Sequence, residues 1–284
     1  MYSAGILAAP SLSPFLANPT IGLQLYTVRD AMAKDPEGTL AKVAQIGYNS
    51  LEGATYTGTQ KFYGMDPQTF KDVLKKNGLI MRSCHYRLGE DKDPKGGDMP
   101  GTLLHEWDKA VSDGAALGLQ YMVCAWLSPA ERQGLDHYKK LADELNKAGE
   151  TCKKSGIQLC YHNHDFEFDK QGDKYPYDVL LENTDPKLVK WEMDLYWVNK
   201  AGQDPIQLFD KYPGRFPLWH LKDMDNTAKH NFTEVGSGVI DFKRIFSGAG
   251  KAGMKYFFVE QDFCPGSPFD SITKSIDYIK KNLV

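Results

Sequence analysis

The sequence predicts an α/β fold, a single-domain (β/α)₈ TIM barrel over residues 21–284. Three observations predict it. Short apolar segments alternate eight times with longer amphipathic segments. A glycine repeatedly ends an amphipathic segment and leads into the next apolar one, as in KKNGLIM, KKSGIQL and GKAGMKY. The first apolar segment runs into VRDAMAKD, which lacks the Gly-rich turn expected of an open, doubly wound sheet.

The expected strands are rich in β-branched and aromatic residues and are bounded by Gly, Pro or Lys-Asn turns. They are residues 21–28, 49–54, 80–86, 121–127, 157–164, 189–197, 217–224 and 255–262. The expected helices carry apolar residues at helical spacing. They are residues 36–47, 66–78, 102–118, 135–156, 175–184, 204–212, 241–253 and 269–282.

The composition argues against a nucleic acid or a membrane surface as the partner. Apolar residues make up 42% of the 284 residues, charged residues 25%, and the net charge is -3. A protein that binds nucleic acid would be expected to carry a basic face, and one that binds a membrane surface a basic amphipathic segment; neither is evident. The five cysteines show no metal-binding spacing, so mostly buried free thiols are expected rather than a disulfide framework. The sequence leaves the oligomeric state open, and a homo-oligomer is compatible with it.

The first 20 residues form an apolar arm of small residues, with no charge before Arg29. The arm resembles a bacterial secretory signal without its basic start, and we favour a remnant of such a signal, which predicts a periplasmic protein. The alternative is an arm packed on the domain, which would also suit a cytoplasmic protein. The arm is too short to span a membrane, and two prolines interrupt it.

Polar residues gather where the expected strands end, which is where a (β/α)₈ barrel carries its chemistry. They are Glu52, His85, His162, His164, Glu192, Asp194, His220, Lys222, Asp223, Glu260 and Asp262. Alternation along a strand places every second residue on one face. One inward layer can therefore hold His162, Asp194, His220 and Glu260, from four adjacent strands.

Two imidazoles and two carboxylates that face one another suit a divalent metal ion. The mixed nitrogen and oxygen set fits Mn²⁺, Zn²⁺, Fe²⁺, Co²⁺ or Mg²⁺, and no thiolate selects zinc. The alternative is a hydrogen-bonded polar cluster without a metal. Aromatic residues lie at or just past the strand ends and suit stacking on a sugar or another polyol, although packing alone could also place them there. They are Tyr26, Tyr86, Trp126, Phe166 and Trp197, with His164 beside them.

GLQLYTVRD, YHNHDFEF, EMDLYWV, HLKD and VEQD together resemble the sugar phosphate isomerase/epimerase family, which has a xylose isomerase-like TIM barrel. Its members include ketose 3-epimerases, hydroxypyruvate isomerase, inosose dehydratase and endonuclease IV. The resemblance implies one metal ligand from each of the last four strands, namely His162, Asp194, His220 and Glu260. The epimerases carry a glutamate at the position matched to His162, so only Glu260 remains of their proton-transferring pair. His164 is the alternative ligand if the register differs by one pair.

The resemblance implies removal of a proton next to a carbonyl of a small carbohydrate. Glu260 is the expected base, with His85, Glu52 or Lys222 as the second acid/base or oxyanion partner. Our leading hypothesis is a metal-dependent isomerase or epimerase that acts through an enediolate. The first alternative is a dehydratase or lyase for a keto-sugar, keto-inositol or 3-keto-glycoside. The second is a non-catalytic sugar-binding barrel. The nuclease branch is disfavoured because a basic face is missing.

Overall fold

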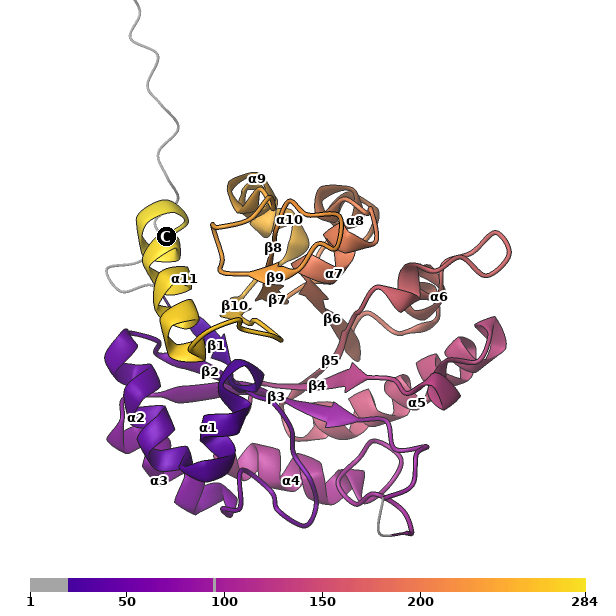
Figure 1. The fold of residues 1–284 in the computed structure, drawn as a ribbon. Coiled ribbons are helices and arrows are strands. Elements are labelled where there is room, and N and C mark those ends of the chain that lie inside the picture. The colour runs from indigo at the N-terminus through magenta and orange to yellow at the C-terminus, as the bar shows by residue number, and fades with distance from the viewer. Residues whose placement is uncertain (1–19, 94–95) are drawn as a thin grey trace, which may run out of the picture.

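The computed structural model describes residues 20–93 and 96–284 (Figure 1). The predicted apolar arm at 1–20, with its interpretation as an export signal, therefore lies outside the described residues except for Thr20. Within the described part, no helix combines the length and apolar character needed to cross a membrane.

Eight parallel strands close into a barrel in the order β1-β10-β7-β6-β5-β4-β3-β2, with helices around it (Figure 1). The barrel strands are β1 (Gly22–Gln24), β2 (Ser50–Gly53), β3 (Ile80–Arg87), β4 (Tyr121–Trp126), β5 (Gln158–His162), β6 (Val189–Asp194), β7 (Leu218–Leu221) and β10 (Tyr256–Val259). The predicted (β/α)₈ barrel is confirmed.

All eight expected helices are found, with additional short ones between them. The α-helices are α1 (Arg29–Lys34), α2 (Pro36–Ile46), α3 (Pro67–Lys76), α4 (Trp107–Leu117), α5 (Leu135–Lys154), α6 (Pro176–Asn183), α7 (Leu195–Lys200), α8 (Pro205–Lys211), α9 (Phe242–Ser247), α10 (Ala249–Ala252) and α11 (Pro268–Asn282). The 3₁₀ helices are η1 (Leu25–Val28), η2 (Pro129–Arg132) and η3 (Phe166–Phe168). A small antiparallel pair, β8 (Asp223–Met224) and β9 (Phe232–Thr233), comes after β7.

Asp-Pro pairs set the start of three helices. Asp35, Asp66 and Asp204 each accept a hydrogen bond from a backbone N–H in the first turn of α2, α3 and α8. Proline at the first helical position has no N–H to leave unpaired, and its fixed φ suits the helix.

Two strands end earlier than predicted because a polar side chain caps the helix that begins directly after each strand. Gln24 accepts a hydrogen bond from the backbone N–H of Tyr26, and residues 25–28 turn into η1. Asp194 accepts hydrogen bonds from the N–H groups of Tyr196 and Trp197, so α7 begins at residue 195 instead of the predicted strand continuing to 197. The expected helix at 241–253 is split into α9 and α10 at Gly248.

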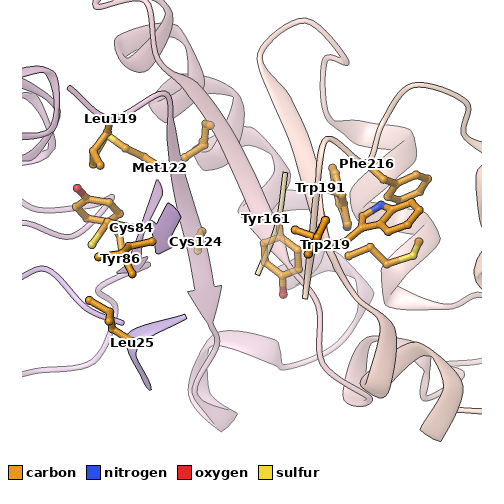
Figure 2. Close-up of a cluster of buried hydrophobic side chains, with 14 of the residues drawn as sticks. Leu25, Cys84, Tyr86, Leu119, Met122, Cys124, Tyr161, Trp191, Phe216 and Trp219 are labelled. Carbon is orange, nitrogen blue, oxygen red and sulfur yellow. The ribbon is translucent and has the colours of Figure 1, made fainter. Parts of the chain in front are cut away.

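The larger part of the core lies between the strands and the helices. Tyr161 faces outward and packs on Trp191, with ring centroids 5.8 Å apart (Figure 2). A smaller apolar cluster fills the interior of the barrel below the mouth. It consists of Val123, Ala125, Cys160, Leu218 and Phe258. All five cysteines are free and four are buried, which confirms the predicted thiols.

The segment after β7 is held by one buried carboxylate. Asp223 accepts hydrogen bonds from four backbone N–H groups, those of Met224, Gly236, Gly238 and Ile240. A Cβ at Gly236, whose φ is +87°, would lie 2.1 Å from the Tyr278 ring, and a Cβ at Gly238 would lie 2.2 Å from the Met224 carbonyl oxygen. Glycine is therefore required at both positions. Asp223, although it lies at a strand end, anchors the segment after β7.

Candidate active site

The carboxyl ends of the strands carry a largely buried polar cluster directly above the apolar interior of the barrel. Its members are Gln24, Glu52, His85, His162, Glu192, Asp194, His220, Lys222, Glu260 and Asp262. Strand pairing places His162 beside Glu192 and Asp194 beside His220. Since alternate residues of a strand share a face, each inward polar residue of β5 and β7 lies one layer above Cys160 or Leu218.

Lys222 forms the centre of the upper part of this cluster. Its Nζ lies 2.9 Å from Asp194 Oδ2, 2.7 Å from Glu260 Oε2 and 2.9 Å from Asp262 Oδ1. Burial would lower the pKa of Lys222, but the three carboxylates hold it well above its ordinary value. Burial would raise the pKa of Glu260, yet Lys222 and His220 hold it below the ordinary range. The pair is therefore an ammonium and a carboxylate at neutral pH.

Asp194 differs from Glu260 in the direction in which its pKa is shifted. Burial raises the pKa of Asp194 to about 6, with Lys222 opposing the rise. Its Oδ2 also accepts no hydrogen bond of good geometry from the described residues, even though Lys222 is near. The Lys222 ammonium faces this oxygen at 2.9 Å, so a metal ion bound here would compete with it.

His220 connects the upper and lower parts of the cluster. Its Nδ1 lies 2.7 Å from Glu260 Oε2, and its Nε2 contacts Glu52 and lies 3.2 Å from Glu192 Oε2. Burial would lower the pKa of His220, but the carboxylates raise it well above the ordinary value. Both ring nitrogens face carboxylate oxygens, which favours the protonated ring, and a metal ion bound at one nitrogen would displace the proton there.

Glu192 is the centre of the lower part. Its Oε2 lies 2.8 Å from His85 Nε2, 3.0 Å from His162 Nδ1 and 3.2 Å from His220 Nε2. Burial would lower the pKa of His85, but Glu52 and Glu192 raise it to about 9. Burial and the neighbouring His220 lower the pKa of His162 well below the ordinary value. Two imidazoles in contact with one carboxylate thus carry different charges at neutral pH.

The four predicted metal ligands lie together around His220. Ligand atoms of Asp194, His220 and Glu260 all lie within 4.8 Å of one another, and His162 belongs to an overlapping group with His85, Glu192 and His220. His162 Nε2 is 3.6 Å from Asp194 Oδ2. This donor set of imidazole nitrogen and carboxylate oxygen fits a divalent ion of the predicted kinds.

His164 lies past the end of β5 and has other neighbours. Its ring stacks on Phe166 at a centroid distance of 5.4 Å, and it is in neither group of clustered ligand atoms among the described residues. Buried Glu167 accepts hydrogen bonds from the His164 N–H at 2.8 Å and from the Tyr161 hydroxyl at 2.6 Å. Of the two histidines, only His162 thus belongs to a group of clustered ligand atoms, whereas His164 is held at the mouth by Glu167.

A cavity of about 940 Å³ lies above the cluster. The predicted substrate-binding residues Tyr26, Trp126, His164 and Trp197 all line it. So do three of the predicted catalytic residues, namely Glu260, His85 and Lys222. Glu52 is fully buried and is not part of the lining; its side chain contacts His220, His85 and Gln24. Glu52 is thus placed to act through His220 and His85.

Sequence reasoning assigned no role to three members of the cluster. Glu192 shares a strand face with Asp194, Asp262 lies two positions after Glu260, and Gln24 donates a hydrogen bond to Glu52 at 2.9 Å. The first two are already among the strand-end residues named from the sequence, and spacing by two places them on the same faces as Asp194 and Glu260. Nothing local distinguished Gln24.

A family model described as xylose isomerase-like TIM barrel matches residues 40–282. The chain belongs to this family. The family resemblance of the strand-end motifs is therefore confirmed. Among solved structures of similar fold is a sugar phosphate isomerase/epimerase from Parabacteroides distasonis. It has a TM-score of 0.80 and 29% identity, and the match covers 98% of this chain and 99% of that one.

Curated relatives of this xylose isomerase-like barrel include inosose dehydratases. That of Geobacillus thermodenitrificans is 30% identical over 165 residues, which are 51% of this chain and 55% of that protein. That of Geobacillus kaustophilus is 27% identical over 283 residues, which cover 85% of both chains. The chain spans about half the length of most of these curated relatives. Proteins named as isomerase/epimerase and as dehydratase thus both resemble it.

Proposed function

We propose that this protein removes a proton next to the carbonyl of a keto-sugar or keto-polyol and then eliminates a β-substituent, as a dehydratase or lyase. The observation that carries the proposal is the separation of two kinds of group at the cavity floor. Glu260 lines the cavity with Lys222 beside it, whereas His85 lines the cavity and contacts Glu52 and Glu192 instead. Two unlike groups suit an elimination, which needs one base and one acid.

Glu260 is the proposed base because it lines the cavity and is ionised at neutral pH. It would take the proton from the carbon next to the carbonyl. Lys222, whose Nζ is 2.7 Å from Glu260 Oε2, would stabilise the oxygen on which negative charge develops. A divalent ion held by Asp194, His220 and Glu260, with His162 beside them, would add Lewis-acid polarisation of the carbonyl.

His85 is the proposed acid. It lines the cavity and has a pKa of about 9, so it carries a proton at neutral pH. The bond to the β-hydroxyl would break with its electron pair, and the leaving oxygen would take the His85 proton. The products would be an unsaturated ketone and water. The inosose dehydratase relatives support this outcome.

The second candidate is an isomerase or epimerase, favoured by the likeness to the Parabacteroides distasonis structure across nearly the whole chain. It would return the proton to the substrate instead of expelling a group. The resemblance implies a glutamate in the epimerases at the position of His162, and this departure also favours elimination.

Product analysis in D₂O separates the two candidates. Keto-sugars and keto-inositols would be incubated with protein supplied with Mn²⁺, Zn²⁺, Co²⁺ or Mg²⁺ and followed by NMR, with a chelator-treated sample as control. Loss of water with a new vinylic signal is the expected result. Deuterium next to the carbonyl in an intact skeleton would instead establish the isomerase. No reaction with any member of the panel would reject both and favour a non-catalytic sugar-binding barrel.

A further inference from the structure

The cavity is larger than the reacting groups require. Its volume of about 940 Å³ is at the upper end of the range, roughly 300–1,000 Å³, of sites that hold drug-sized ligands. The proposed acid, base and ammonium (His85, Glu260 and Lys222) occupy only its floor, where a single sugar ring would lie. The rim is formed by residues that the proposed chemistry does not use. They include Tyr26, Arg29, Trp126, Arg132 and Phe166.

One side of the rim is an aromatic wall backed by a guanidinium. The rings of Trp126 and Phe166 are 5.9 Å apart at nearly a right angle, and the Arg132 guanidinium lies 3.9 Å from the Phe166 centroid. Arg132 forms no ion pair with any described residue. Stacking thus fixes the guanidinium while leaving its N–H groups available to a ligand.

The same pairing recurs at Tyr26. The Arg29 guanidinium lies 4.2 Å from the centroid of the Tyr26 ring. Tyr26 is 42% exposed and Trp126 is 40% exposed, whereas most aromatic residues of the described chain are buried. Exposed aromatic faces inside a concave site favour the apolar face of a ring, and the adjacent arginines can donate to its hydroxyl groups.

We infer that the rim is a second subsite and that the substrate is a glycoside or disaccharide rather than a free monosaccharide. The reacting ring would lie on the floor, and the second ring would stack on Trp126 beside Arg132. The identity of the reacting ring rests on the proposed function. The existence of the outer subsite rests on the rim itself.

Binding measurements test the inference without requiring turnover. Calorimetry would compare matched pairs that differ by one ring, such as methyl β-cellobioside with methyl β-glucoside and methyl α-maltoside with methyl α-glucoside. We expect the two-ring ligand of at least one pair to bind about tenfold more tightly to the wild type. Trp126→Ala and, independently, Arg132→Met should remove most of this difference, with folding checked by circular dichroism.

The matched control is Phe263→Ala, which removes an aromatic side chain that is 67% exposed but does not line the cavity. It should leave the preference unchanged. Equal affinity within every pair, no binding by any two-ring ligand, or a preference that survives both rim substitutions would overturn the inference. If keto-monosaccharides react while two-ring ligands do not bind, the proposed function stands and the outer subsite falls. A preference for two-ring ligands without any turnover would support the outer subsite and reject the proposed function.

Discussion

Lys222 Nζ lies 2.7 Å from Glu260 Oε2, so a protein ammonium stands beside a carboxylate predicted to bind a metal ion. Two unit charges at about 4 Å interact by roughly 4 kcal/mol at an effective dielectric of about 20. Removing the ammonium should therefore help a divalent cation. We expect Lys222→Met to bind Mn²⁺ at least about tenfold more tightly than the wild type in calorimetry.

The control for this experiment is Lys251→Met, because Lys251 is an exposed lysine paired with Asp210. It should bind Mn²⁺ as the wild type does. If a folded Lys222→Met protein bound Mn²⁺ no more tightly than the wild type, the ammonium would not compete with the metal ion for Glu260.

Asp194 and His220 are predicted to be metal ligands. Asp194→Ala and His220→Ala should each weaken Mn²⁺ or Zn²⁺ binding by at least about a hundredfold, because each removes a ligand atom of the Asp194–His220–Glu260 group. Metal content after dialysis, measured by mass spectrometry, checks this. Asp165→Ala is the matched control, since Asp165 lines the cavity but belongs to neither group. Wild-type metal content in both ligand variants would disprove the assignment.

Glu167 should make stability depend on pH. Burial raises its pKa from 4.5 to about 7. The folded state therefore holds this proton more tightly than the unfolded state, and stability falls as pH rises from about 4.5 through 7, by about 3 kcal/mol at most. Glu167→Gln should remove this part of the slope. Urea unfolding at pH 4.5, 6 and 8 measures it; an unchanged slope would show that Glu167 is ionised throughout.

Asp223 should be a determinant of stability. Replacing it with alanine leaves four backbone N–H groups without their acceptor. We expect Asp223→Ala to lose about 2–4 kcal/mol in the free energy of unfolding. Asp225→Ala is the comparison, because Asp225 also accepts backbone hydrogen bonds but is only partly buried, and it should lose less. Equal, small losses of unfolding free energy in both variants would show that Asp223 does not anchor this segment.

The sequence was sufficient for the barrel and for the face on which the site residues lie, because both depend on periodicity. The sequence left His162 and His164 as alternative ligands, and only the structure shows that His162 alone of the two has its ring nitrogen in a group of clustered ligand atoms. β5 ends at His162, and the chain then turns so that His164 stacks on Phe166. The early end of β6 depended on a hydrogen bond from α7 to Asp194, which no periodic pattern encodes. The contact of Glu192 with three imidazoles could not be predicted either, because it joins β6 to β3, β5 and β7 across the interior of the barrel.

The central claim is that Glu260 removes a proton from carbon. The substrate would be a keto-sugar or keto-inositol that the wild type converts. The rate of deuterium exchange or elimination should be measured for the wild type and for Glu260→Gln under the same metal conditions. Ligand affinity would be measured in parallel by calorimetry. We predict that Glu260→Gln retains binding but reacts at least about a hundredfold more slowly, in line with the loss of a general base. A folded Glu260→Gln protein that reacts at the wild-type rate would contradict the account.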